Sequence, residues 1–532
     1  MNAVLAHPAP VALPPIESAE QIPPYSENLC RPGGQIRLRD EDAKLVALLE
    51  VAHRQVLVLW AGSPSERRAL VAAQARASTL GYRIMSVRNA TIEVIALCSE
   101  EQAAHGEDSL ESTDATRMFD EWLARAVAMK ASDLHIMLMR THAMVRVRVD
   151  GELVNLAQVR TGVAESVARA MYTQAEVDSR RGQPSFNNDE FQDAAISRTI
   201  SVGGKVEELK LRWASGPVWP DAFDVSIRIL NIGQETRERT LEKLGFNASQ
   251  QAALGDALKD PAGVILLCGR TGDGKSTTLA TLADMWGART GGTRLMRTIE
   301  DPPEYLIKVA RQMPVSRTGG EGGATGFHRA LRAAMRMDPD SILVGEVRDE
   351  ITADLLQQVI QTGHKAFATV HAGSPFTALW RLEELGIKRA RLVDEGFINA
   401  IVHQTLVPVL CRHCARPMSD ANVPPDLHEQ LAAALDSEQL AAVRVRGPAC
   451  EHCHNGVSGR RAIAEILLPD TRMRVLLRKG EDMEAIDYWR SGTMPLHGDV
   501  QARSLTAQAM ELIGSGLVSP LDAELIVGRL HP

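Results

Sequence analysis

The stretch GVILLCGRTGDGKSTTLATLADMW, residues 263–286, constrains the fold more than any other part of the chain. An apolar run from Val264 to Leu267 is typical of a buried strand, and Lys275 begins a segment with helical apolar spacing. The glycines between them permit backbone conformations that point successive N–H groups into one concavity at a helix N-terminus, and such a concavity binds phosphate. The sequence therefore predicts a strand, a phosphate-binding loop and a helix within an α/β fold.

The loop also matches a specific pattern. Residues 269–276 fit G-x-x-x-x-G-K-[ST], in which the lysine reaches the β- and γ-phosphates of a nucleotide and the serine hydroxyl binds Mg²⁺. The alternative is a glycine-rich turn without chemistry, which the strand before it and the helix after it disfavour. The expected nucleotide contacts are Gly269, Arg270, Thr271, Gly272, Asp273, Gly274, Lys275, Ser276 and Thr277.

Composition narrows the class of protein. The 532 residues suffice for about three or four domains. A formal net charge of −8, with only five Tyr and nine Phe, disfavours a general nucleic-acid-binding role. The longest weakly charged stretch, residues 397–411, is shorter than the ~20 apolar residues of a membrane-spanning helix. No basic residue precedes Arg31, so we expect no signal peptide, a cytoplasmic chain and reduced cysteines.

The periodicity of apolar residues divides the chain into regions. LVALLEVAHR has the spacing of a helix, whereas QVLVLW and YRIMSV are typical of strands. SDLHIMLMR and AMVRVRVDGEL alternate apolar and polar residues around a turn, which predicts a β-hairpin. We expect a mobile Pro-rich tail at 1–40, a small α/β domain at 41–110, an α+β domain at 111–230, a linker at 231–240 and a second α/β domain at 241–532.

Three later strands of the second α/β domain end in polar side chains. RLMRTIEDPPE ends in Glu300, Asp301 and Glu304, SILVGEVRD in Glu346, and KAFATVHAG in His371. Ligands in open α/β sheets lie at the carboxyl ends of strands, so these groups are expected beside the phosphate loop, where acids suit Mg²⁺ and an attacking water. Alternatives are a local ion pair of Glu346 with Arg348, a solvated acidic turn and ordinary half-buried histidines.

The cysteines form a second constellation. Cys411-Arg-His-Cys414 and Cys450-Glu-His-Cys453 are two C-x₂-C units that place four thiolates about a Zn²⁺ ion. Two redox pairs or unused thiols are the alternatives, while the remaining cysteines lack such spacing and are interpreted as structural. The segment between the two units contains few large apolar groups, so we expect its order to depend on the metal.

Four boxes together resemble one family. GRTGDGKSTTL, TIEDPPEY, DPDSILVGEVRD and GHKAFATVHAGS stand in the order and spacing of the type II secretion and type IV pilus ATPases, and the resemblance covers residues 112–532. It implies a RecA-like ATPase domain, a preceding regulatory domain and a zinc module at 405–465 of the kind found in assembly and secretion members. Arg270, Asp273 and Val457 stand where the family more often has Pro, Ser and Tyr.

The resemblance also implies a mechanism. The chain would be a homohexameric, ATP-hydrolysing motor that drives type IV pilus assembly or type II secretion through an inner-membrane platform protein, with only peripheral membrane contact and no nucleic acid. Glu304 would orient water, Glu346 and Ser276 would hold Mg²⁺, and His371 would sense the γ-phosphate. Arg212 and Arg228 would close over the phosphates, although outward-facing strand arginines are the alternative. The competing interpretation is a nucleic-acid translocase with a zinc module.

Overall fold

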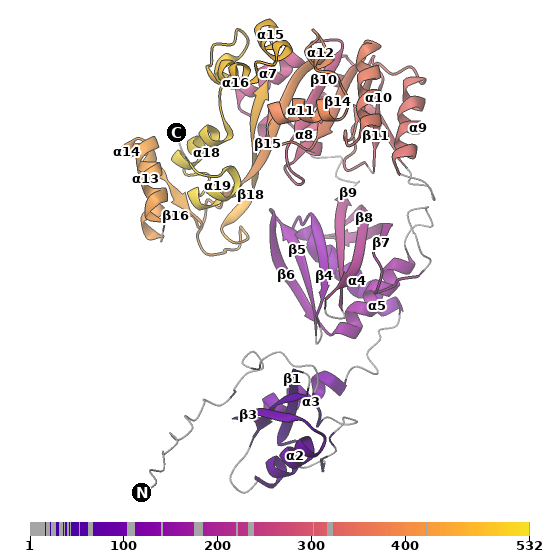
Figure 1. The fold of residues 1–532 in the computed structure, drawn as a ribbon, viewed down its shortest axis with the longest axis vertical. Helices are drawn as coiled ribbons and strands as arrows, with labels where there is room; N and C mark the ends of the chain where they lie inside the picture. Colours follow the sequence, from indigo (N-terminus) through magenta and orange to yellow (C-terminus); the bar gives the residue numbers. More distant parts are fainter. Residues whose placement is uncertain are drawn as a thin grey trace, which may run out of the picture.

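The computed structural model places three bodies along the chain, in sequence order (Figure 1). The residues that it describes are 16, 22, 28–30, 36, 38–39, 42, 44–52, 54–61, 67–103, 112–139, 142–174, 185–219, 222–231, 239–301, 303–315, 323–421 and 423–530. Within these residues no helix combines the length and the apolar character needed to cross a membrane.

The N-terminal body is a three-stranded sheet in the order β1-β2-β3, with a helix on each face. Its elements are β1 (Val46–Ala52), β2 (Gln55–Trp60), α2 (Arg67–Thr79), β3 (Arg83–Asn89) and α3 (Ile92–Ala103). The helix expected for LVALLEVAHR is wrong, because Val46–Ala52 is a strand antiparallel to β2. The four residues VALL are buried on both sides of the sheet, and such a run carries no period that separates a strand from a helix.

The expected mobile tail at 1–40 differs from the structure where the structure describes it. Ile16 bridges Ala90 beyond the end of β3, and Leu29 and Ile36 are buried in the core of the same body. The body therefore begins before residue 41. The other residues of the tail, apart from the few named in the description above, lie outside the described part of the chain.

The second body is an α+β domain. A six-stranded antiparallel sheet in the order β6-β5-β4-β9-β8-β7 packs its apolar face on α4 and α5. The predicted hairpin is confirmed, because β4 and β5 pair antiparallel from Asp133↔Arg148 to Leu138↔Ala143. The elements are α4 (Ser112–Ala128), β4 (Asp133–Leu138), β5 (Ala143–Val149), β6 (Glu152–Val159), α5 (Thr161–Thr173), β7 (Gln192–Val202), β8 (Lys205–Val218) and β9 (Ala222–Asn231). Of the expected linker, residues 232–238 lie outside the described residues.

The third body contains a seven-stranded sheet in the order β12-β11-β13-β14-β10-β15-β18, in which only β18 is antiparallel to its neighbour. Alternate residues of β10 face two cores, one with Val264 and Leu266 and the other with Ile265 and Leu267, so helices cover both faces. The elements are α6 (Leu241–Leu244), α7 (Ala248–Ala257), β10 (Gly263–Cys268), α8 (Lys275–Arg289), β11 (Met296–Glu300), β12 (Ala310–Pro314), α9 (Gly323–Met335), β13 (Ser341–Val344), α10 (Glu350–Gln361), β14 (Lys365–Val370), α11 (Pro375–Glu384), α12 (Arg389–Leu392) and β15 (Ile398–Leu410).

The cysteine-containing segment leaves this sheet at the end of β15 and returns in β18. It is followed by the C-terminal helices, of which α18 and α19 lie between the segment and the sheet (Figure 1). The elements are β16 (Arg416–Pro417), the 3₁₀ turn Met418–Asp420, α13 (Pro425–Ala434), α14 (Ser437–Ala442), β17 (Arg444–Val445), β18 (Val457–Leu467), α15 (Thr471–Lys479), α16 (Asp482–Arg490), α17 (Gly498–Gln501), α18 (Leu505–Gly514) and α19 (Pro520–Val527).

This segment has more apolar packing than the sequence suggested. Leu427, Leu431 and Val443 are fully buried or nearly so, in one cluster with Ile513 of α18 and Ala523 of α19. The apolar side chains of the segment pack against helices that lie more than 50 residues later in the chain. Local composition does not reveal these contacts.

Candidate functional site

The phosphate loop has the backbone that its glycines predict. β10 ends at Cys268, and α8 begins at Lys275 directly after Gly274, which has a φ of 79°. Gly269 and Gly272 have φ values of 147° and 88°, which L side chains rarely adopt. The N-terminus of α8 therefore opens onto the loop, where its unpaired N–H groups and the helix dipole favour an anion.

Lys275 lies inside this loop. Its Nζ donates to the carbonyl oxygens of Gly269 and Arg270, at 2.9 and 2.7 Å. Burial lowers the pKa of the Lys275 ammonium, and the carboxylates of Asp273 and Glu346 oppose that shift. The ammonium is thus held within the concavity, where a nucleotide's β- and γ-phosphates would replace the two carbonyl oxygens as its partners.

Asp273 fastens the loop to the neighbouring strand. Its carboxylate accepts from the backbone N of Arg270 and from Thr405 Oγ1 of β15, the latter at 3.1 Å. Gln404 Nε2 donates to the carbonyl oxygen of Asp273 at 2.6 Å. The side chain that departs from the family pattern therefore preserves the loop, and Thr405 is a supporting residue that the sequence analysis missed because its contact is 132 residues distant.

The carboxyl ends of β13 and β14 bring two predicted residues together. Glu346 Oε1 lies 3.0 Å from His371 Nε2, and Glu346 Oε2 lies 2.6 Å from Arg348 Nη2. The ion pair with Arg348, one of the sequence alternatives, is therefore present, and it coexists with the histidine contact. Both Glu346 and His371 line the same cleft as Lys275.

The three acidic residues at the end of β11, Glu300, Asp301 and Glu304, do not all have the same environment. Glu300 accepts hydrogen bonds from Thr298 Oγ1 at 2.6 Å and Gln312 Nε2 at 2.9 Å, and burial raises the pKa of its carboxyl group. Glu304 is about one-third exposed and lies 3.8 Å from Arg228 Nη1 of the α+β domain. All three acids line the cleft, but the carboxylate of Glu300 is already engaged by Thr298 and Gln312.

The α+β domain supplies a row of charged side chains to the opposite wall. Cross-strand pairing aligns Arg148 with Asp133, Asp133 with Arg228, and Arg228 with Arg212, so the four side chains share one face of the sheet. Arg228 Nε donates to Asp133 Oδ1 at 3.2 Å. Arg212 and Arg228 were expected at the site, whereas Arg148 was missed because its place in the row depends on strand register.

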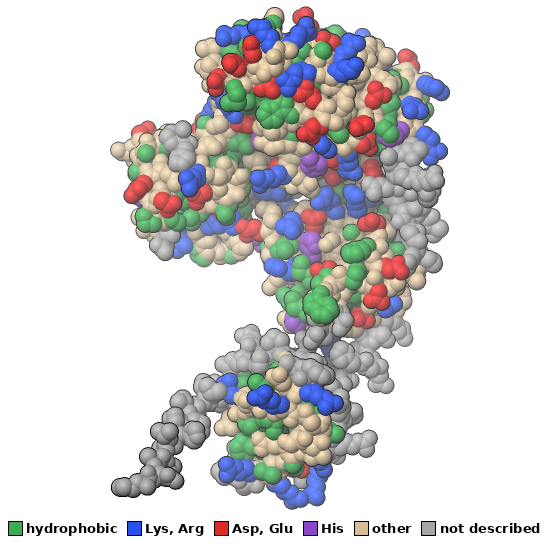
Figure 2. All heavy atoms as spheres, in the orientation of Figure 1, with side chains coloured by type: hydrophobic (Ala, Val, Ile, Leu, Met, Phe, Trp, Pro, Cys, Tyr) green, Lys and Arg blue, Asp and Glu red, His purple; other side chains and the backbone are tan. Residues whose placement is uncertain are grey.

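The two walls enclose a cleft of about 1990 Å³. Figure 2 shows Lys and Arg side chains gathered where the α+β domain meets the third body. Besides the residues above, Ser276, Thr271 and Thr277 line it, as does Arg460, which the sequence analysis did not single out. A cleft with phosphate-loop N–H groups, acids and several cations suits a nucleoside triphosphate and a divalent ion.

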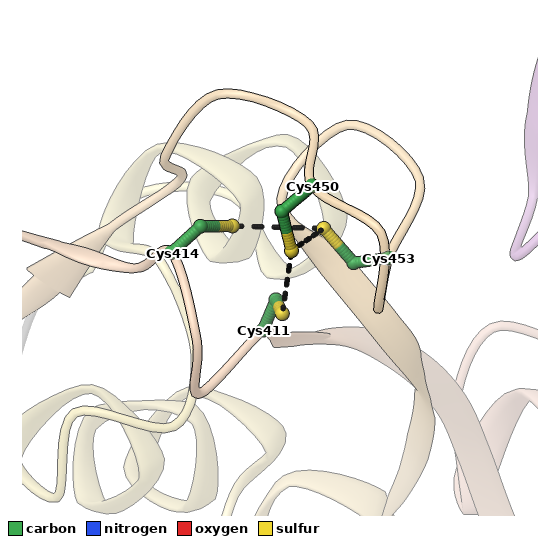
Figure 3. Close-up of side chains that lie close together, drawn as sticks. All are labelled: Cys411, Cys414, Cys450 and Cys453. Carbon is green, nitrogen blue, oxygen red and sulfur yellow. Dashed lines mark hydrogen bonds between the residues drawn. The ribbon is translucent and has the colours of Figure 1, made fainter.

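The four predicted cysteines converge at a separate place (Figure 3). The sulfur–sulfur distances are 3.8 Å for Cys411–Cys450 and 3.5 Å for both Cys414–Cys453 and Cys450–Cys453. A regular tetrahedron with Zn–S bonds of about 2.3 Å has edges of about 3.8 Å, so the four thiols fit a structural zinc ion. All four sulfurs lie within 4.8 Å of one another, and no histidine of the described residues joins the group.

The remaining cysteines fit the structural role expected for them. Cys30, Cys98 and Cys268 are buried. Burial raises the pKa of the Cys30 thiol to about 12 and raises that of Cys268 further, which makes both thiols poor nucleophiles at neutral pH.

Comparison with known proteins agrees with this geometry. The profile of the family described as "Type II/IV secretion system protein" matches residues 108–507. "Type II secretion system protein E" of Pseudomonas aeruginosa is 28% identical over 90% of this chain and 89% of its own length. The Klebsiella pneumoniae protein of the same name is 30% identical, with 78% of each chain covered.

Two further similarities concern pilus assembly and the fold. "Type IV pilus assembly ATPase PilB" of P. aeruginosa is 29% identical over 75% of this chain and 67% of its own length. The X-ray structure of the Legionella pneumophila ATPase DotB superposes with a TM-score of 0.52 at 19% identity, over 77% of this chain and 95% of that chain, and supports the fold alone. Since the family profile spans well over half of the sequence, the chain belongs to the type II/IV secretion system protein family, the secretion ATPases.

Proposed function

We propose that this protein is an ATP-hydrolysing motor that powers type II secretion or type IV pilus assembly. The observation that carries the proposal is the shared cleft, in which the phosphate loop and Glu346 face Arg228 of the α+β domain. The relatives named above as type II secretion system protein E and PilB support the two candidate processes and do not favour a nucleic-acid translocase.

Within the cleft, each side chain has a proposed part in hydrolysis. The loop N–H groups and Lys275 would bind the β- and γ-phosphates, and Ser276 and Glu346, which line the cleft, would hold a Mg²⁺ ion that neutralises phosphate charge. Glu304 orients the attacking water, and His371 senses the γ-phosphate through its contact with Glu346. Arg228 and Arg212 stabilise the charge that develops on the transferred phosphoryl group.

The α+β domain and the ATPase domain must approach and separate for this chemistry to perform work. Closure excludes water from the phosphates, and reopening releases products. We propose that this cycle runs in a homohexameric ring and is passed to an inner-membrane platform protein. The chain would then act on the cytoplasmic side, in peripheral contact with the membrane.

The four cysteines are proposed to hold one zinc ion per chain with a structural role. The short turns carry the necessary backbone contacts, since Cys414 N and Cys453 N donate to the carbonyl oxygens of Cys411 and Cys450 at 3.3 and 3.1 Å. A filled four-sulfur shell leaves no open position for catalysis, so the ion would fix the fold of the segment.

The proposal is tested by Lys275→Ala. The variant removes the ammonium that neutralises the phosphates, so phosphate release by the purified protein should fall by at least about a hundredfold. Lys259→Ala is the matched control, because Lys259 is exposed and pairs only locally with Asp256 of α7. Hydrolysis by Lys275→Ala at the rate of the unaltered protein would refute the assignment.

A further inference from the structure

The hairpin β5–β6 of the α+β domain touches the cysteine-containing segment. Glu152, the first residue of β6, forms an ion pair with Arg446, and its other oxygen accepts from Asn455 Nδ2 at 3.0 Å. Burial raises the pKa of the Glu152 carboxyl group, but the bonds from Asn455 and Arg446 outweigh it, so the net pKa lies below the usual value. Glu152 is thus bound as a carboxylate by two side chains 294 and 303 residues away.

Both partners of Glu152 belong to the turn that the cysteines shape. Arg446 precedes Cys450 by four residues, and Asn455 follows Cys453 by two. The backbone of Gly447 lies close to the first cysteine pair: a Cβ atom on residue 447 would lie 1.6 Å from the carbonyl oxygen of Cys414. Gly456, next to Asn455, accepts from Cys411 N at 2.8 Å. The placement of Arg446 and Asn455 therefore depends on the two cysteine pairs remaining together.

A second carboxylate, on α19, also holds the Arg446 side chain. Its Nε donates to Asp522 Oδ2 of α19 at 2.7 Å, and the Asp522 side chain is only 11% exposed. One half of the guanidinium is thereby occupied by the C-terminal helices, while the other half faces Glu152. A planar guanidinium held in this way presents its remaining donors in a fixed direction.

We propose that the tetracysteine module is an interdomain clasp, in which Arg446 and Asn455 grip Glu152 and hold the α+β domain over the nucleotide cleft. Glu152 lies at the turn of the β5–β6 hairpin, and Arg148 of β5 belongs to the charged row along the cleft. Because the strands of this sheet are paired, a contact that fixes the hairpin also fixes the position of the charged row that includes Arg228. The role assigned to the closed cleft rests on the proposed ATPase function, whereas the clasp itself is a contact between two domains.

The clasp predicts coupling between zinc and a hairpin that contains no zinc ligand. Hydrogen–deuterium exchange of residues 143–159 should rise when zinc is removed from the full-length protein by a chelator. Glu152→Ala should raise it to a similar extent with zinc present. Glu208→Ala, at an exposed position of β8 in the same domain, is the matched control and should leave exchange in the hairpin unchanged.

The combination of both changes provides the decisive comparison. If zinc acts on the hairpin through Glu152, chelation of Glu152→Ala should add little further exchange, because coupled changes are not additive. Reciprocity requires that Glu152→Ala also bind zinc roughly fivefold more weakly than Glu208→Ala does, as measured by equilibrium competition with a chromophoric chelator. Asn455→Ala, which leaves the charge pair intact, should show a smaller effect in the same direction.

Two results would overturn the clasp: hairpin exchange that does not respond to chelation, or additive effects of chelation and Glu152→Ala. Neither measurement involves nucleotide hydrolysis. An inactive wild-type protein would consequently refute the proposed ATPase function and leave the clasp standing, and a failed clasp would leave that function untouched.

Discussion

Replacing Arg228 by Ala distinguishes between a catalytic and a structural role of this residue. Arg228 lies in the middle of the charged row, 3.2 Å from Asp133 in its own domain and 3.8 Å from Glu304 across the cleft. If it serves only as a surface strand residue, its loss should affect stability and leave turnover alone. If it stabilises phosphoryl transfer, turnover should suffer far more than stability.

The structure sets the expected size of the structural effect. The Arg228 side chain is 39% exposed and that of Glu304 35%, so solvent screens their attraction. Pairs of this kind contribute about 0.2–1 kcal/mol each, and the two contacts together should stabilise the fold by about 1 kcal/mol. An arginine that neutralises charge in a phosphoryl transfer is expected to accelerate turnover by roughly a thousandfold, a much larger effect.

The assay pairs thermal unfolding with steady-state hydrolysis at saturating ATP. Arg198→Ala is the matched control in the same sheet, because Arg198 binds both carboxylate oxygens of Asp120 and also Gln174, away from the cleft. We expect Arg198→Ala to lower the unfolding temperature at least as much as Arg228→Ala while hydrolysing ATP normally. If Arg228→Ala loses less than about tenfold in turnover, Arg228 is a structural cross-strand residue and the reasoning is refuted.

Three other perturbations have defined outcomes. Glu304→Gln should bind nucleotide normally and hydrolyse it about 10²–10⁴-fold more slowly, and a collapse of nucleotide affinity measured by calorimetry would instead make Glu304 a metal-site residue. Cys453→Ser should lose one zinc per chain by elemental analysis and loosen the cysteine turns to protease, while nucleotide binding persists. Burial lowers the pKa of Lys365 to about 8, whereas the pKa of a lysine in an unfolded chain is about 10.4. Between these two pH values the unfolded state binds more protons than the folded state, so the free energy of unfolding rises with pH. Urea unfolding should show this rise, of about 3 kcal/mol, in the wild type and not in Lys365→Met; equal slopes would contradict it.

Local signals in the sequence were sufficient to predict the phosphate loop and the residues at the strand ends around it. Glycine positions and a buried strand before Lys275 fix the loop conformation, and the carboxyl ends of parallel strands necessarily meet at one sheet edge, which gathers Glu304, Glu346 and His371. The two C-x₂-C units likewise predicted the cluster of four sulfurs. In each case the relevant geometry is set within a few residues or by a general rule of sheet topology.

Long-range contacts could not be read in the same way. The row from Arg148 to Arg212 depends on the register of four strands, and a shift of one residue would turn every side chain to the other face. One hydrogen bond that engages the Glu300 carboxylate comes from Gln312 on another strand. The strand at Val46–Ala52 was missed because an apolar run that is buried on both faces has no distinguishing period.

Two paired strands, β15 and β18, connect the phosphate loop with the four cysteines. β15 fastens Asp273 through Thr405 and ends at Leu410, next to Cys411. β18 begins at Val457, four residues after Cys453, and its Arg460 lines the cleft. The two strands pair antiparallel from Ile401↔Leu467 to Leu410↔Val457, so they form one stiff ribbon with the nucleotide loop beside its middle and the cysteines at its end. Displacement of the loop on nucleotide binding would therefore be transmitted along the ribbon to the turns that hold Arg446 and Asn455. The proposed nucleotide site and the proposed grip on Glu152 would thus be linked through two paired strands, whose register shifts between Val409 and Leu410 beside the first cysteine pair.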